Sequence, residues 1–162
     1  RAFRAVVPGA VRAFGPEVLV TQCGCDTHHE DPLDNLELSV DGQRQAIAEL
    51  HRLAHEAAAG LTVAFGGGGY GLIRCVPRTW THLLAEASGV PIAPETLVPS
   101  AWADHLRGRG VSVALPQTMG EGRTPHADPW IPGGDSWLDR AIGAARHASF
   151  PLLGLDPDDP RD

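Results

Sequence analysis

The chain has 162 residues, with 20 acidic side chains against 13 basic ones and a formal net charge of −7. That length suits one domain with a sizeable core. An acidic chain without a basic cluster argues against nucleic acid as a partner. No apolar run reaches the roughly 18 residues of a membrane-spanning helix, so no membrane partner is expected.

The cysteine content favours a reducing cytoplasm. Three cysteines do not make a disulfide framework, and Cys23 and Cys25 are too close in sequence to pair comfortably. The chain starts at Arg1, and its first residues already have the pattern of a helix interior. We therefore expect it to be a piece of a longer protein.

The first part of the chain alternates helical and strand patterns, which is typical of an α/β fold with parallel strands. Pro8-Gly9 either kinks the first helix or divides it in two. Both strands have continuous apolar residues and are expected to be buried. In chain order we expect a helix over residues 3–14, a strand over 17–23, an acidic loop over 24–40, a helix over 41–59, a strand over 61–65 and a helix over 77–88.

The second part is less regular, with more Gly, Pro and polar residues. Ser136 and Asp139 resemble a capping box that opens a helix. The tail is rich in proline and acids, which is typical of disorder. In chain order we expect a connector over 91–99, a short helix over 102–106, an edge strand over 111–115, a long surface loop over 117–134, a helix over 136–148 and a disordered tail over 156–162.

Two unusual segments follow the two predicted strands. Residues 22–33 are rich in Cys, His and acidic side chains, and Gly66–Gly69 are four glycines closed by Tyr70, the only tyrosine. Ligands of parallel α/β sheets collect at the carboxyl ends of the strands. We therefore predict that the two segments form half of one metal-dependent active site.

Each segment also has a simpler interpretation. Four potential ligands stand side by side at 28–31, and adjacent side chains rarely converge on one ion, so a solvated polar loop remains an alternative. The glycine run lacks the lysine of a phosphate-binding loop and can be a structural turn. His51 and His55 are one helical turn apart, but Arg52 stands where a metalloprotease helix needs Glu, which favours surface histidines.

Taken together, the motifs resemble the zinc-dependent histone deacetylase family over about residues 1–90. The matching pieces are residues 22–26 (Gln-Cys-Gly-Cys-Asp), residues 31–33 (Asp-Pro-Leu), residues 66–70 (Gly-Gly-Gly-Gly-Tyr) and residues 78–80 (Arg-Thr-Trp). The resemblance implies the C-terminal half of a parallel-sheet arginase/deacetylase fold with helices on both faces. It assigns residues 1–115 to the deacetylase domain and residues 116–155 to a loop and a helix that pack on it.

The resemblance also implies roles for individual residues. Asp31 would be a ligand of the catalytic zinc, and Tyr70 would donate its hydroxyl to the substrate carbonyl as that oxygen becomes an oxyanion. Leu38 would line the channel for the acyl-lysine stem, and the backbone of Gly68 would form the channel wall. Two further residues, Asp26 and Gln22, would contact the residues of the site without binding the metal themselves, or would have a purely structural role.

The function implied is a deacetylase that removes acetyl groups from protein lysines, in a bacterial branch linked to acetoin and acetyl-CoA metabolism. Zn²⁺ is the expected cofactor, with Fe²⁺ as the alternative metal. The family's paired histidines and Asp-x-His ligands lie upstream, so these 162 residues are expected to need the N-terminal half of the same domain as a partner. The alternatives are a deacetylase of acetylated polyamines or other small amides, and a non-catalytic interaction domain.

Overall fold

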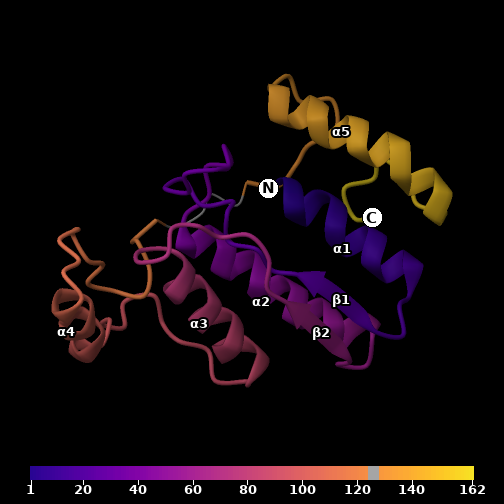
Figure 1. Ribbon diagram of the computed structural model, residues 1–162. Helices are drawn as coiled ribbons and strands as arrows, with labels where there is room; N and C mark the ends of the chain where they lie inside the picture. The colour runs from indigo at the N-terminus through magenta and orange to yellow at the C-terminus, as the bar shows by residue number, and fades with distance from the viewer. Residues whose placement is uncertain (124–127) are drawn as a thin grey trace. The chain divides into compact units, whose positions relative to one another are not determined.

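The computed structural model describes residues 1–123 and 128–162, and the α/β fold class is confirmed. Helices and strands alternate over the first half of the chain (Figure 1). The elements are α1 (Ala2–Phe14), β1 (Leu19–Gln22), α2 (Val40–Ala57), β2 (Thr62–Phe65), α3 (Val76–Ala87), α4 (Ser100–Gly108), α5 (Trp137–Ser149) and the 3₁₀ helix η1 (Phe150–Leu153).

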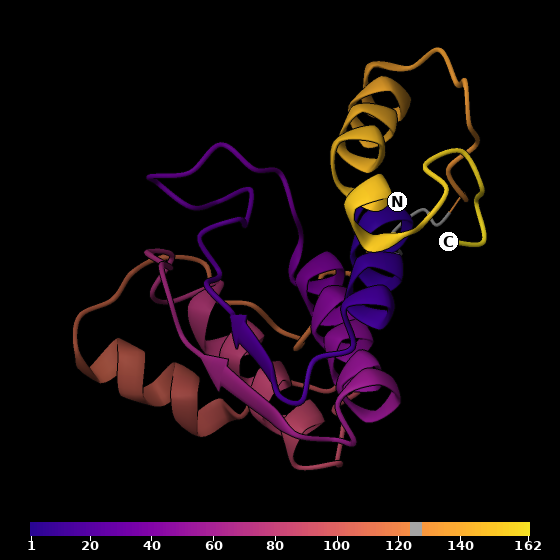
Figure 2. The ribbon, with the colours of Figure 1, turned by 90° about the vertical axis from the view of Figure 1, so that its right-hand side faces the viewer.

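The two strands form one parallel sheet. The amide of Leu19 donates to the carbonyl of Leu61 at 3.0 Å, and four residues further on the amide of Cys23 donates to Phe65 at 2.8 Å. Figures 1 and 2 show both arrows pointing the same way. Because α2 connects the strands, β1, α2 and β2 make the crossover unit that the sequence predicts.

The chain divides into two compact units, and the sheet strands run from one into the other. The first unit holds residues 1–20, 50–63 and the described part of 126–162; the second holds residues 21–49 and the described part of 64–125. None of the helices described is both long and apolar enough to cross a membrane.

The first unit buries an apolar cluster between β1, α1 and α2. Leu19 packs with Leu53, Ala54 and Ala58 of the α2 region, and Val7 and Val11 of α1 pack against them. Pro8 lies inside α1, which is one helix and not two. The helix α5 lies beside α1 (Figures 1 and 2).

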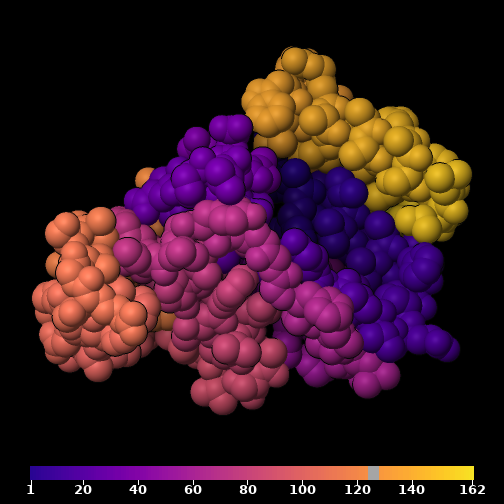
Figure 3. All heavy atoms as spheres, in the orientation of Figure 1, coloured from indigo at the N-terminus to yellow at the C-terminus, as the bar shows by residue number. Residues whose placement is uncertain are grey.

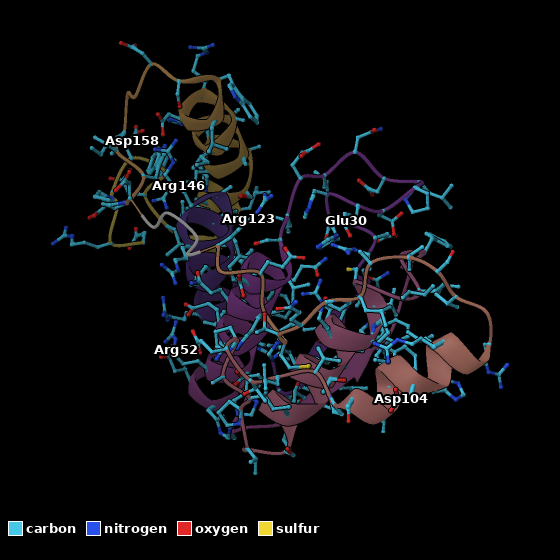
Figure 4. All side chains as sticks on the ribbon, turned by 90° about the vertical axis from the view of Figure 1, so that its left-hand side faces the viewer. Glu30, Arg52, Asp104, Arg123, Arg146 and Asp158 are labelled. Atoms are coloured by element: carbon cyan, nitrogen blue, oxygen red, sulfur yellow. The ribbon has the colours of Figure 1, made fainter. Side chains whose placement is uncertain are left out.

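Arg146 of α5 is the largest buried side chain of the first unit, with 1% of its surface exposed. Its guanidinium donates to five backbone carbonyls, and it stacks over the rings of Trp130 and Phe150 at 4.6 and 4.1 Å from the ring centroids. The carbonyls belong to Ala5, Asp156, Pro157, Asp159 and Asp162. Figure 4 shows Arg146 beside this C-terminal segment, where the sequence predicts a disordered tail. The predicted boundaries of residues 116–155 stay a prediction.

The expectation that both strands are buried is wrong: in β1 only Leu19 is buried, and Val20 is 61% exposed. All four residues of β2 are exposed, including Val63 at 42% and Phe65 at 58% of their surfaces. Burial depends on what packs above a strand, which the residues of the strand themselves do not determine. The magenta segment that includes β2 accordingly reaches the surface in Figure 3.

The edge strand predicted over 111–115 is also wrong. The amide of Val111 instead donates to Leu106 at 3.1 Å, as part of the end of α4. Strand-like pairing occurs later, in an antiparallel bridge between Leu97 and Thr118. The surface loop predicted over 117–134 has residues 124–127 outside the described part of the chain.

The capping box that opens α5 is confirmed. The hydroxyl of Ser136 accepts from the amide of Asp139 at 3.0 Å, and the same hydroxyl donates to the Asp139 carboxylate at 2.5 Å. Replacing Ser136 with alanine is therefore expected to lower the free energy of unfolding by about 1 kcal/mol. Urea unfolding measures this, and S149A, at the far end of the same helix, is the control. Equal effects of the two substitutions would contradict the capping role.

Candidate metal and active site

The glycine loop after β2 lies directly against side chains that follow β1. A Cβ at Gly67 would overlap the amide of Gln22, and a Cβ at Gly68 would overlap the carboxylate of Asp26. The carbonyl of Gly68 also accepts from the amide of Cys25 at 2.8 Å. The two segments predicted to share a site therefore meet, and the missing side chains of the glycines make room for the contact.

Gly69 requires glycine for a second reason. Its φ of +153° lies in the region that L-residues rarely adopt, and a Cβ there would lie 2.6 Å from the sulfur of Cys25. Cys25 is fully buried with Cys75 and Val76 at the start of α3. The loop is thus packed against two elements and is not a free surface turn.

Asp31 joins the two loops through backbone hydrogen bonds. Its Oδ2 accepts from the amide of Tyr70 at 2.8 Å, and its Oδ1 accepts from the amide of Leu33 at 3.0 Å. Burial raises the pKa of Asp31, but these bonds and those of the Asp34 and Gly71 amides outweigh it and hold the pKa below its usual value. Asp31 is an ionised carboxylate, and each of its oxygens already accepts a backbone amide.

Tyr70 and Asp31, 39 positions apart, are in contact through the backbone amide of Tyr70, and the predicted meeting of the carboxylate with the phenol stays a prediction. The Tyr70 side chain is 50% exposed. A half-exposed phenol beside a carboxylate loop is placed to meet a ligand, and its catalytic role stays a prediction.

Asp26 differs from Asp31 in its hydrogen bonding. Its side chain is half-buried against Gly68. Among the residues that the structure describes, no hydrogen bond reaches its carboxylate. A carboxylate held against a loop with its lone pairs free fits the oxygen donor of a metal site. Two carboxylates thus compete for the ligand role that the sequence analysis gave to Asp31.

Leu38 belongs to the loop between β1 and α2. Its amide donates to Thr27 at 3.0 Å and its carbonyl accepts from His29 at 2.9 Å, which closes the loop on itself. The side chain is 43% exposed, and that of Leu33 on the same loop is 69% exposed. Both are available to line a substrate channel, and the role of Leu38 there stays a prediction.

A further group of possible metal ligands consists of His28, His29 and Glu121, whose ligand atoms lie within 4.8 Å of one another. The fully buried ring of His28 does not fit this role. Its Nδ1 accepts from the amide of Glu30 at 3.1 Å, so the proton is on Nε2, which lies 2.9 Å from Glu121. A metal on Nε2 would move the proton to Nδ1, where it would face the Glu30 N–H.

Glu121 is occupied by protein partners too. Burial raises its pKa, but His28 and Arg78 lower it to about 2, so the carboxylate is ionised. Its Oε1 accepts from Arg78 at 2.9 Å as well as from His28. These contacts are those of an ion pair and not of a metal site.

The sequence analysis missed Gln43 of α2 as well as Glu121. The buried amide of Gln43 donates to the carbonyl of Cys25 at 3.1 Å and accepts from the hydroxyl of Thr79 at 2.7 Å. It thereby ties the end of β1 to α3. Its spacing from Ile47 along the apolar side of the helix was the available signal, because a polar residue there needs buried partners.

Comparison with known proteins gives the family context. A family model described as "Histone deacetylase domain" matches residues 1–87, which is more than half of the chain. These residues include both loops of the candidate site.

Similar curated proteins carry the name "Acetoin utilization protein AcuC". The protein of Bacillus subtilis (strain 168) is 33% identical over 117 residues, covering 64% of this chain and 30% of its own length. That of Staphylococcus aureus (strain Mu50) is 29% identical over 119 residues, 64% of this chain and 31% of its own length. That of Staphylococcus xylosus is 29% identical over 100 residues, which cover 62% of this chain and 26% of its own length. The chain thus spans about three tenths of the length of these relatives.

Proposed function

The chain belongs to the histone deacetylase family, and on that premise we propose that the full-length protein is a zinc-dependent hydrolase that removes acetyl groups from lysine side chains of proteins. The observation that carries the proposal is the contact between the two loops. The Asp26 carboxylate lies against Gly68 without a hydrogen-bond donor among the residues described, and the same glycine loop ends in Tyr70. The name of the similar proteins supports a link to acetoin metabolism.

Asp26, and not Asp31, is the carboxylate ligand that we propose. Both Asp31 oxygens accept from backbone amides, of Leu33 and of Tyr70, and these bonds compete with a metal ion for the oxygen lone pairs. A metal on Asp31 would weaken the bond from the Tyr70 amide, which holds the two loops together. Within the described part of the chain, Asp26 accepts no such bond. Asp31 then serves the site by fixing the backbone of Tyr70.

A bound zinc ion would supply a Lewis acid that polarises the amide carbonyl and activates water for attack. Catalytic zinc sites use about three protein ligands, and the described residues fit the role with one carboxylate. We propose that the other ligands come from a part of the full-length protein outside these 162 residues. Fe²⁺ is the alternative metal for the same set of donors.

The residues of this chain have separate tasks in the proposed reaction. Tyr70 donates its phenolic proton in a hydrogen bond to the substrate oxygen, which gains negative charge as water adds to the carbonyl. The backbone of Gly68 forms part of the wall of the channel for the acyl-lysine stem, while its missing side chain makes room for Asp26. Asp31 holds Tyr70 in place through the backbone.

Metal content distinguishes the two carboxylates. In the full-length protein we expect D26N to lower zinc affinity by at least about 100-fold, since it removes a charged ligand. D31N is expected to keep most of the zinc and to lose stability instead, by about 1–3 kcal/mol, because the amide cannot accept all of the backbone bonds. Zinc is measured by competition with a chelator and stability by urea unfolding. The reverse pattern would restore Asp31 as the ligand.

The substrate class needs its own experiment. A panel of acetyl-lysine peptides and acetylated polyamines is offered to the zinc-loaded full-length protein. Faster turnover of the peptides is expected. Preference for the polyamines would assign a small-amide deacetylase, and absence of turnover with zinc bound would assign a non-catalytic interaction domain.

A further inference from the structure

Glu121 connects three elements that surround the candidate site. Its Oε1 accepts from His28 of the β1–α2 loop at 2.9 Å and from Arg78 of α3 at 2.9 Å. Its Oε2 accepts from the amide of Val40 at the start of α2 at 3.3 Å. His28 precedes Glu121 by 93 positions, and Glu121 lies beyond the residues 1–87 that match the family.

His28 in turn fixes the loop between the two carboxylates. Its amide donates to Cys25 at 3.3 Å, and its carbonyl accepts from the amide of Asp31 at 2.9 Å. The ring is fully buried, and its Nδ1 accepts from the amide of Glu30 at 3.1 Å. Every polar atom of His28 is therefore paired, and its Nε2–H reaches beyond the loop to Glu121.

A carboxylate is needed at position 121 because all of its partners are donors. A glutamine has one acceptor oxygen, and its NH₂ group would face either Val40 or the pair of His28 and Arg78. Donors facing one another in a buried site repel, so the amide leaves one partner unpaired. Arg78 reinforces the geometry, because it also donates to the carbonyl of Gly120 at 3.0 Å.

We propose that Glu121 is a positioning residue for the metal site: it holds the His28 ring, and through His28 it holds the loop that carries Asp26 and Asp31. The part of the chain beyond the matched residues thereby contributes to the active site without touching substrate or metal. The expected effect of Glu121 on metal binding rests on the function proposed above. Its role in holding the His28 ring in place does not.

The test compares E121Q with E30Q in the full-length protein. Glu30 lies on the same loop (Figure 4) and pairs with Arg74 at 2.8 Å. Both of these side chains are more than a third exposed, so E30Q makes the same change of charge without opening a buried contact. Three quantities are measured: the protonated nitrogen of His28 by ¹⁵N NMR, amide hydrogen exchange at residues 30 and 31, and zinc affinity by chelator competition.

In the unsubstituted protein His28 is expected to carry its proton on Nε2. E121Q is expected to populate a second form of the ring, to speed exchange at Glu30 and Asp31 about tenfold or more, and to weaken zinc binding by about 10- to 100-fold. E30Q should change zinc affinity by less than about twofold.

Unchanged exchange and ring protonation in E121Q would overturn the proposal. So would a loosened loop with unchanged zinc affinity, since Glu121 would then serve the fold alone. If the unsubstituted protein binds no zinc, the proposed function fails, and the metal-free exchange data still decide whether Glu121 holds His28. Should E121Q not fold, H28Q and H28A replace it. The glutamine amide can still donate to Glu121, so H28Q should retain more zinc affinity than H28A, and equal loss would overturn the proposal.

Discussion

Replacing Tyr70 with phenylalanine in the full-length protein is expected to lower turnover of an acetyl-lysine substrate by about 100- to 1,000-fold. The substitution removes the only hydroxyl that the glycine loop can offer to the developing oxyanion. The fold should be preserved, because Asp31 binds the backbone amide of Tyr70, which phenylalanine keeps. The measurement is steady-state kinetics, with the loss in kcat and not in KM.

The control is zinc content and thermal stability of the same variant, both of which should match the unsubstituted protein. A Y70F variant with unchanged turnover would defeat the role of Tyr70. A variant that loses zinc or unfolds would show that the hydroxyl of Tyr70 supports the structure of the site.

Replacing Arg146 with alanine is expected to lower the free energy of unfolding by about 3 kcal/mol, the largest effect on stability that we anticipate from the described residues. The guanidinium is buried between two aromatic rings and donates to five carbonyls of the N- and C-terminal segments. Removal leaves a cavity and leaves those carbonyls without their donor. Equilibrium urea unfolding measures the change.

Arg12 is a matched control in the same unit. It pairs with Glu56 at 3.1 Å, but both side chains are at least 40% exposed. R12A should therefore cost less than about 0.5 kcal/mol. Similar losses for R146A and R12A would show that the carbonyl contacts of Arg146 contribute little.

The sequence predicted the parts of the fold that depend on local chemistry. Helical apolar spacing located α1, α2 and α3 within two residues of their ends, and the Ser136 box located the start of α5. An edge strand was expected over 111–115, but a strand also needs a partner, which local pattern does not encode. The exposure of β2 was missed for the same reason.

The candidate site was predictable in position but not in its hydrogen bonds. Strand ends and the glycine run were enough to bring residues 22–33 and Tyr70 together. Which carboxylate keeps free lone pairs depends on the amides around Asp31, and these became visible only in the folded chain. Glu121 could not be found from sequence at all, because its partner His28 is 93 positions away.

The two-stranded sheet has a practical consequence. Within the described residues β1 pairs only with β2, so each strand has a row of backbone donors and acceptors without a ladder partner. A strand of another chain can pair with such a row, and the exposed apolar side chains of Val63 and Phe65 favour this association. A preparation of these 162 residues by themselves should accordingly be prone to precipitation, and charged gatekeeper substitutions on β2 offer a way to keep it in solution.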